Sequence, residues 1–521
     1  MKIALAQINP TVGDLAGNVD RCLDAIAEGD RRRADLVVLP EMAIPGYPPR
    51  DILYDSSFID AIGEATRDLA HRAAGGPPAL VGTVALGGAT TVKHPGLHNA
   101  VALLRDGEAT TAAIKRLLPA YDVFLEPRWF TPGPALPPLE IAGKRIGVIV
   151  CEDMWDESYP VHPPAEALSA GADMLVVAAA VPYRTGIQAE RLHHARRHGC
   201  PLVHVNLCGA NDELIFDGQS FALNAAGELV AQLPAFDEAV QVVDLETAMP
   251  LKADAGPQNG ELFGALVLGI RDFACKNGSP HLFLGLSGGI DSSLVAVLAA
   301  EAVGPANVTG VAIPSRYTDP RSTESAATLA RALGIGFEIV ELAPLHTAVE
   351  ATLGDLLVSG EAGGTRADVT TAAENAQARL RMLILMAFVN RYGGLLLNTS
   401  NKTELALGYG TLYGDLAGTL SPIGDLTKPQ VYDLARWVQE TRGAIIPPFV
   451  LERPPSAELK PGQVDPFDYP KIAPALEALV RANRSNAALR RSEHKRQHHG
   501  IILKVSEKAF GSGRMIPITR R

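Results

Sequence analysis

The sequence predicts an α/β protein of two domains, the second built on a doubly wound parallel sheet. Three observations carry this prediction. Short apolar runs alternate with helical patterns in both halves, a glycine-rich turn joins one such run directly to a helix, and a loose segment divides the chain near its middle. The length of 521 residues suits two or more domains. With 47% hydrophobic and 20% charged residues, the chain can bury full cores.

The first half contains apolar runs rich in Val, Ile, Leu and Ala, without strict alternation of polar and apolar residues. This pattern is typical of strands buried within an α/β arrangement. The segment 224–228, "NAAGE", predicts a hairpin turn inside the run 221–230. The runs predicted as strands are residues 2–8, 34–41, 79–86, 100–107, 145–153, 173–180, 202–208, 221–230 and 239–246.

A segment rich in Pro, Gly and small polar residues, 247–260, predicts a linker between a first domain, 1–246, and a second domain, 261–521. The second domain repeats a strand–helix alternation typical of a doubly wound parallel sheet. Its predicted strands are 281–285, 307–316, 336–342 and 394–401, and its predicted helices include 262–278 and 375–393.

Charge and cysteine content narrow the class of protein. The 58 Asp and Glu residues outnumber the 47 Lys and Arg residues, giving a net charge of -11, which argues against a nucleic-acid-binding protein. The five cysteines are scattered without a CxxC pair, which indicates a reducing compartment. No apolar run approaches the roughly 18 residues of a membrane helix, and the first residues do not resemble a signal peptide. We therefore expect a cytoplasmic protein without a membrane partner.

The glycine-rich turn is the segment "SGGIDSS", Ser287–Ser293, between a buried strand and a helix. Its backbone N–H groups and the positive end of the following helix favour a phosphate. No Lys follows the glycines, so the turn is not a Walker A loop. Asp291 would repel a phosphate unless a Mg²⁺ ion lay between them. The turn therefore predicts a phosphate site that works with Mg²⁺.

This motif resembles the pyrophosphate loop of the N-type ATP pyrophosphatases, which split ATP between its α- and β-phosphates. The resemblance implies a Rossmann-like domain that transfers AMP to an acceptor oxygen and releases pyrophosphate. Adenylation turns a carboxylate oxygen into a leaving group that an amine can displace. The implied ATP-binding residues are Gly285, Leu286, Ser287, Gly288, Gly289, Ile290, Asp291, Ser292 and Thr399.

Four further segments, 374–382, 398–435, 454–459 and 509–519, resemble the NAD synthetase family in sequence and order. The resemblance implies that the acceptor is the nicotinate carboxylate of nicotinic acid adenine dinucleotide (deamido-NAD). Asp291 and Glu404 would hold Mg²⁺. The residues implied to bind deamido-NAD are Asn375, Glu404, Asp415 and Lys495.

Four basic residues of the second half are open to two interpretations. Lys402 and Lys428 fit a role in neutralising phosphates, although a lone Lys is commonly a solvated surface charge. Arg379 and Arg381 fit a solvated helix face equally well.

In the first half, Glu41, Lys115 and Cys151 follow separate predicted strands, so their side chains can converge. A cysteine needs an activated thiol to be a nucleophile, and a nearby lysine would lower its pKa. A glutamate could take the thiol proton and return it to the leaving group. A lone Cys after a buried strand is more often a core residue, so the spacing alone leaves both readings open.

The segments "LPEMAIPGYPPRD", "KRLLPAYDVFLEPRWF" and "CEDMW" around these residues resemble the nitrilase, or carbon-nitrogen hydrolase, superfamily. The resemblance extends over nearly all of the first half and is nearest to glutaminase domains fused to NAD synthetases. It implies an αββα sandwich in which Cys151 attacks the amide of glutamine and releases ammonia. It also implies a further catalytic carboxylate, Glu126, and a glutamine contact at Tyr121.

Two implied glutamine-binding positions depart from the family. Val181 replaces a serine and Ile187 replaces a lysine, whereas Arg191 is retained. The loss of a hydroxyl and a cation should weaken capture of the amino-acid end of glutamine, and Arg184 is a candidate to compensate.

The resemblance therefore implies an ATP-consuming ligase in a homo-oligomer, with ammonia passing between its sites in a closed passage. Its substrates would be small molecules: deamido-NAD, ATP and glutamine. One alternative is the same synthetase using mainly free ammonia because its amidase domain is weakened. Another is a nucleotide-binding regulator with both sites silent, against which the intact Glu41, Lys115, Cys151, Asp291 and Glu404 argue.

Overall fold

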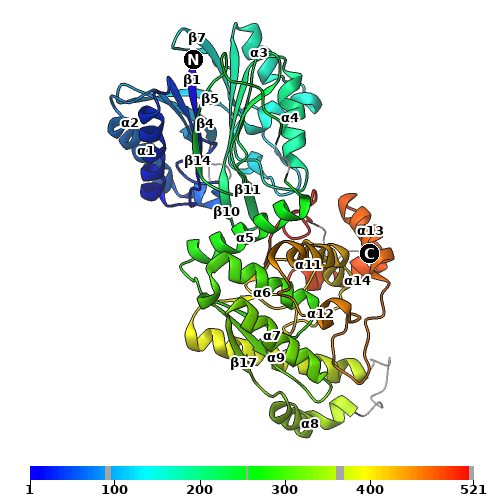
Figure 1. The fold of residues 1–521 in the computed structure, drawn as a ribbon. Helices are drawn as coiled ribbons and strands as arrows, with labels where there is room; N and C mark the ends of the chain where they lie inside the picture. The colour runs from blue at the N-terminus through cyan, green and yellow to red at the C-terminus, as the bar shows by residue number, and fades with distance from the viewer. Residues whose placement is uncertain (88–95, 254–255, 359–368, 516–521) are drawn as a thin grey trace. The chain divides into compact units, whose positions relative to one another are not determined.

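The computed structural model describes residues 1–87, 96–253, 256–358 and 369–515 (Figure 1). The chain divides between Pro257 and Gln258 into two compact units, and each is described here by itself. Among the described residues, no helix combines the length and apolar character needed to cross a membrane.

The first unit, Met1–Pro257, contains two six-stranded sheets. The order of the first sheet is β14 (Ala239–Asp244), β1 (Lys2–Gln7), β2 (Leu36–Val38), β3 (Ala79–Leu86), β4 (Leu97–Arg105) and β5 (Glu108–Ile114). The order of the second is β13 (Leu229–Gln232), β12 (Phe221–Leu223), β9 (Leu202–Asn206), β8 (Met174–Ala179), β7 (Lys144–Val150) and β6 (Leu139–Ile141). A separate hairpin joins β10 (Cys208–Asn211) and β11 (Leu214–Asp217).

Helices cover the outer faces of the two sheets. The first sheet packs against α1 (Leu15–Arg31) and α2 (Ser56–Arg72), and the second against α3 (Pro163–Ser169) and α4 (Ile187–Arg197) (Figure 1). The inner faces of the sheets meet, since β1 contacts β9 and β5 contacts β7. The predicted αββα sandwich is confirmed. Short 3₁₀ turns lie at Arg50–Tyr54, Glu126–Arg128, Cys151–Met154 and Asp156–Ser158.

Strands β5 and β6 escaped the sequence analysis for different reasons. The β5 sequence, "EATTAAI", carries threonines and small residues in place of a run of large apolar ones, and β6 has only three residues. The hairpin turn predicted at 224–228 does join β12 to β13, with the Asn224 N–H donating to the Glu228 carbonyl at 3.0 Å.

The second unit, Gln258–Arg521, has one six-stranded, fully parallel sheet. Its order is β17 (Gly336–Ile339), β16 (Val308–Ala312), β15 (Leu282–Gly285), β18 (Leu395–Leu397), β19 (Leu420–Ser421) and β20 (Ile501–Ile502). Numbered from β15, this is the order 3-2-1-4-5-6 of the doubly wound fold, which confirms the predicted class.

The helices of this unit are α5 (Gln258–Lys276), α6 (Ile290–Val303), α7 (Pro320–Leu333), α8 (Ala343–Val358), α9 (Val369–Tyr392), α10 (Lys402–Leu407), α11 (Lys428–Arg442), α12 (Pro448–Glu452), α13 (Tyr469–Arg481) and α14 (Ala487–Arg496), with a 3₁₀ turn at Pro305–Asn307. The strand order reverses between β15 and β18, and ligands of this fold bind at the carboxyl ends of strands at such a point. The glycine turn follows β15 and Thr399 follows β18, so both lie where a nucleotide is expected. Residues 516–519 of the last family-like segment lie outside the described residues.

Candidate active sites

The candidate site of the first unit is assembled from both of its sheets. Glu41 follows β2 and Lys115 follows β5, both in the first sheet, whereas Cys151 follows β7 in the second. All three residues are buried, with Lys115 exposed by 1% and Glu41 by 0%. The structure therefore brings these predicted residues together.

Lys115 lies at the centre of the cluster. Its Nζ donates to Glu41 Oε1 at 2.8 Å and to Glu126 Oε1 at 2.7 Å. Burial lowers the pKa of the Lys115 amine, but the adjacent Glu126 and Glu41 carboxylates outweigh this effect and raise that pKa well above its usual value. Lys115 is therefore a buried ammonium ion.

The two carboxylates on Lys115 differ in their other contacts. Glu41 accepts hydrogen bonds from Asn99 Nδ2 at 2.6 Å and from the Ala180 N–H at 2.9 Å. Glu126 accepts one from the Tyr47 hydroxyl at 3.0 Å, while its Oε2 has no partner among the described residues. Burial raises the pKa of Glu126 to about 7, against the opposing charge of Lys115.

Cys151 begins a 3₁₀ turn and has a φ of 48°, a left-handed conformation that is strained for a residue other than glycine. Such strain is common where a turn presents a reactive side chain. Burial raises the pKa of its thiol well above the usual value, and the Glu41 carboxylate adds to this effect, while Lys115 lowers it. Lys115 therefore acts in the predicted direction, but burial and the Glu41 carboxylate outweigh it. A base is needed to take the thiol proton at the moment of attack.

The residues predicted to bind glutamine lie in contrasting surroundings. Tyr121 is exposed by 53%, and its hydroxyl donates to Glu152 Oε2 at 3.0 Å, beside the nucleophile. Val181 and Ile187 are buried at 8% and 4% exposure, so neither offers a charge to an amino acid.

The two nearby arginines already have carboxylate partners. Arg191 is fully buried and forms an ion pair with Asp217, and it also donates to the Val181 carbonyl at 3.1 Å. Arg184 NH1 donates to Glu190 Oε1 at 2.8 Å. Arg191 therefore joins Asp217 to the backbone at Val181.

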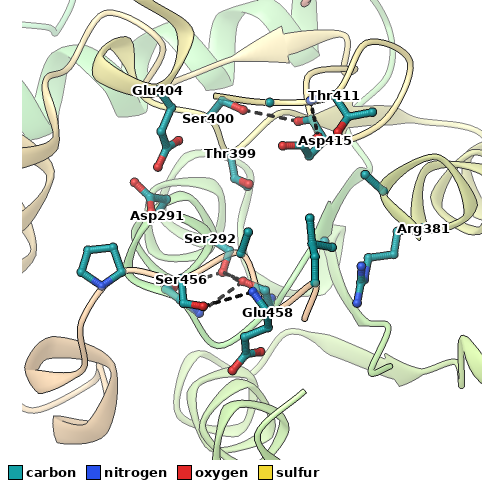
Figure 2. A pocket seen from close by; sticks show the side chains of 18 of the residues that line it. Asp291, Ser292, Arg381, Thr399, Ser400, Glu404, Thr411, Asp415, Ser456 and Glu458 are labelled. Carbon is teal, nitrogen blue, oxygen red and sulfur yellow. Dashed lines mark hydrogen bonds between the residues drawn. The ribbon is translucent and has the colours of Figure 1, made fainter. Parts of the chain in front are cut away.

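The candidate site of the second unit is a cavity of about 520 Å³ at the carboxyl ends of β15 and β18 (Figure 2). It is lined by every predicted nucleotide- and acceptor-binding residue except Gly288: Gly285, Leu286, Ser287, Gly289, Ile290, Asp291, Ser292, Asn375, Thr399, Glu404, Asp415 and Lys495. The sequence patterns of the second half therefore converge on one hollow.

Gly288 turns the loop and does not line the cavity. Its φ of 77° is left-handed, and a Cβ added there would lie 2.1 Å from the Ser322 carbonyl oxygen, so only glycine fits. Beside it, the Ser287 and Ser292 hydroxyls lie 3.1 Å apart and Gly289 N donates to Ser287 Oγ at 3.2 Å. These contacts hold the loop at the N-terminus of α6, where a phosphate is favoured.

Asp291 and Glu404 point toward one another across the cavity (Figure 2). Lys428 Nζ lies between them, 2.5 Å from Asp291 Oδ2 and 3.0 Å from Glu404 Oε1. Asn401 Nδ2 also donates to Asp291 Oδ1 at 2.9 Å. Burial raises the pKa of Glu404 to about 7, with Lys428 opposing this effect.

Asp291 and Glu404 alone supply too few oxygen ligands for a divalent cation, so a bound substrate would have to supply the others. Both carboxylates converge on the Lys428 ammonium, and their hard oxygen donors also suit Mg²⁺. No group of three or more His, Cys, Asp or Glu residues suited to a metal occurs within the described part of the chain. Phosphate oxygens would therefore have to complete the coordination.

The structure places the four basic residues that were open to two interpretations in different surroundings. Lys428 lines the cavity, but Lys402 does not, because its Nζ pairs with Asp425 at 3.1 Å and Glu477 at 2.8 Å behind α10. Neither interpretation describes Lys402, because its buried side chain is engaged in these ion pairs and is not a solvated charge. Arg381 lines the cavity and donates to the Ile313 carbonyl at 3.1 Å, while Arg379 reaches the Leu412 carbonyl on the outside.

The far wall of the cavity carries a polar network (Figure 2). Asp415 Oδ1 accepts from the Thr411 N–H at 2.7 Å, and the Thr411 hydroxyl donates to Asn375 Oδ1 at 2.7 Å. Lys495 Nζ donates to the Gly408 and Gly410 carbonyls at 2.8 Å each. Three predicted acceptor-binding residues thus share one wall, each held in place by its neighbours.

Sequence reasoning named the segment 454–459 only by resemblance and missed that the rim of the cavity extends to Arg453, Gln463 and Asp465. Glu458 Oε1 accepts from the Ser322 hydroxyl at 2.8 Å and from Arg453 NH2 at 3.0 Å, which ties this rim to α7. The family-like segment 454–459 marked the rim in sequence, but nothing there indicated these contacts. Asn99 and Ala180, which hold Glu41, carried no signal at all.

Comparisons with known proteins assign a family to each half of the chain. Residues 2–250 match the carbon-nitrogen hydrolase family and residues 262–509 match the NAD synthase family. Glutamine-dependent NAD(+) synthetases from Synechocystis sp. and Rhodobacter capsulatus are 38% and 40% identical to this chain. The alignments cover 99% and 100% of this chain and 98% of each relative.

A solved structure shows the same likeness over both units. The glutamine-dependent NAD+ synthetase from Acinetobacter baumannii in complex with adenosine diphosphate is 30% identical, with a TM-score of 0.79. The match covers 99% of this chain and 98% of that one. The chain belongs to the glutamine-dependent NAD(+) synthetase family.

Proposed function

We propose that this chain converts deamido-NAD to NAD at the expense of ATP, using ammonia that its first unit releases from glutamine. The observation that carries the proposal is that one chain holds both a buried Cys151–Lys115–Glu41 centre and a cavity in which Asp291 of the glycine turn and Glu404 point toward one another. The membership in a glutamine-dependent family disfavours the alternative that relies mainly on free ammonia.

In the first unit, Cys151 Sγ attacks the amide carbon of glutamine as Glu41 takes the thiol proton. The Lys115 ammonium, held by Glu41 and Glu126, stabilises the negative oxygen of the tetrahedral intermediate. Glu41 returns the proton to the departing nitrogen, which leaves as ammonia and a thioester remains. Water then hydrolyses the thioester to glutamate, and the thiol is restored.

In the second unit, a carboxylate oxygen of deamido-NAD attacks the α-phosphorus of ATP, and pyrophosphate leaves. The loop from Gly285 to Ser292 would hold the phosphates, and Thr399 the nucleoside. The wall of Asn375, Asp415 and Lys495 would hold the dinucleotide acceptor. Ammonia then displaces AMP and forms the amide of NAD.

We propose Mg²⁺ as the cofactor of this half-reaction, held by Asp291 and Glu404. When bound, it would offset the charge of the leaving pyrophosphate. The Lys428 ammonium, which pairs with both carboxylates, offsets part of their charge.

We also propose that the chain acts as a homo-oligomer. Helices α8 and α9 pack on each other and leave Leu356, Leu383 and Tyr392 exposed by 76%, 59% and 68%. These exposed apolar side chains are available for contact with a second copy of the chain. Light scattering that showed a monomer at every concentration would contradict this proposal.

Isotope tracing of the nitrogen tests the proposed function. With deamido-NAD, ATP, Mg²⁺, glutamine labelled with ¹⁵N in its amide and an equal amount of unlabelled ammonium, we expect mass spectrometry to find mostly ¹⁵N-labelled NAD. Unlabelled NAD as the main product would assign the nitrogen to free ammonia. AMP and pyrophosphate without any NAD would refute the transfer of nitrogen to the adenylated carboxylate.

A further inference from the structure

Asp153, two residues beyond the nucleophile, has an unusual set of contacts. Its carboxylate is 1% exposed and accepts hydrogen bonds from three backbone N–H groups. Oδ1 accepts from Arg116 at 3.0 Å and from Leu117 at 2.8 Å, and Oδ2 accepts from Val150 at 3.1 Å. These three hydrogen bonds of the Asp153 carboxylate therefore fix the backbone and do not reach a side chain that faces the substrate.

The three donors come from the two sheets of the first unit. Arg116 and Leu117 follow Lys115 at the end of β5, whereas Val150 is the last residue of β7 and precedes Cys151. A hydrogen bond to Val150 alone would be an ordinary cap of the 3₁₀ turn. The bonds to Arg116 and Leu117 add a connection between the lysine-bearing strand and the cysteine-bearing strand.

The catalytic centre needs such a connection because its members belong to separate layers. Glu41 also crosses between the sheets, through the Ala180 N–H at 2.9 Å, but in the proposed reaction Glu41 changes its charge at each proton transfer. Asp153 takes no part in that transfer. A misplacement of about 1 Å at a reacting centre can cost about 100-fold in rate.

The burial of Asp153 itself has an energetic cost. Burial raises the pKa of its carboxyl to about 6, although the three backbone donors and the Lys115 charge lower it. A hydrophobic residue would avoid this cost but would leave the three N–H groups without an acceptor. The contacts thus explain why a carboxylate occupies this buried position.

We propose that Asp153 is a positioning residue that fixes the Cys151 sulfur relative to Lys115 by joining the ends of β7 and β5. The inference rests on the proposed role of Cys151 as the glutamine nucleophile.

The test compares Asp153→Asn with Asp173→Asn in the full chain. Asp173 also accepts a backbone N–H, from Arg145 at 2.8 Å, but it precedes β8, at the opposite end of that strand from Ala180. In Asp153→Asn an amide NH₂ replaces one acceptor oxygen, so the carboxamide cannot satisfy all three donors. We expect the kcat for glutamine-driven NAD formation to fall about 100-fold with Asp153→Asn. The KM for glutamine and ammonia-driven synthesis should change less than about threefold.

Two further measurements decide between positioning and a merely structural role. Rapid quench should show that formation of the Cys151 thioester is the step that slows. Thermal unfolding should show that Asp153→Asn is folded. If it is not, Asp153→Glu, which keeps the charge but moves the oxygens by one methylene, should show the same loss of kcat.

A glutamine kcat near that of the wild type in folded Asp153→Asn or Asp153→Glu would overturn the inference. So would an equal loss of glutamine- and ammonia-driven synthesis, or a large rise in KM alone. Failure of the proposed function is distinguishable, since it would appear as glutamine-driven synthesis that survives the loss of the Cys151 thiol.

Discussion

We expect Cys151→Ala to lower glutamine-driven NAD formation by at least about 10⁴-fold, because loss of a catalytic nucleophile removes the covalent route entirely. Ammonia-driven formation should stay within about threefold of the wild type, because Cys151 belongs to the first unit and adenylation is assigned to the second. Steady-state assays of NAD with each nitrogen donor, at saturating ATP and deamido-NAD, measure both rates.

The matched control is Cys22→Ala. Cys22 is another buried cysteine of the first unit, on α1, with no assigned role. It should retain glutamine-driven synthesis. Equal glutamine-driven rates in Cys151→Ala and the wild type would remove Cys151 from the mechanism and favour an enzyme that uses free ammonia. Loss of both activities would point to damage beyond the amidase site.

The second large effect concerns the paired carboxylates. We expect Asp291→Asn and Glu404→Gln each to lower NAD formation by about 100-fold or more with either donor, because metal sites tolerate the loss of a ligand poorly. Release of pyrophosphate should fall in parallel. Both substitutions keep the shape of the side chain, so the cavity should persist.

Asp433→Asn is the control for this pair. Asp433 lies on α11 and forms an exposed ion pair with Arg436, so its change should leave the rate near that of the wild type. Thermal unfolding is measured beside the assays, because each active-site change removes one partner of the buried Lys428. A folded Asp291→Asn with full activity would contradict the proposed metal site.

Much of the fold could be predicted from local patterns in the sequence. Strands β15 to β18 of the second unit are apolar and flanked by turns, and the glycine turn after β15 marks the switch point of the sheet. The two-residue strands β19 and β20 were not predicted. Strand β5 could not be found in this way, since most of its side chains are not buried and its place depends on pairing with β4.

The candidate sites show a similar division. Residues directly after strands, such as Glu41 and Cys151, could be identified because strand ends converge. The net pKa of the Cys151 thiol could not be foreseen, because it depends on how deeply the whole site is buried. Lys402 and Lys428 look alike in sequence. Only the tertiary structure directs Lys428 into the cavity and Lys402 into a buried ion pair with Asp425.

The central claim is that the second unit attaches AMP to the carboxylate of deamido-NAD before nitrogen arrives. Deamido-NAD labelled with ¹⁸O in its nicotinate carboxylate tests this most directly, with mass spectrometry of the products. The proposed mechanism requires one labelled oxygen in each AMP formed and none in the pyrophosphate. Label in pyrophosphate, or AMP that carries no label while NAD forms, would contradict adenylation of the carboxylate.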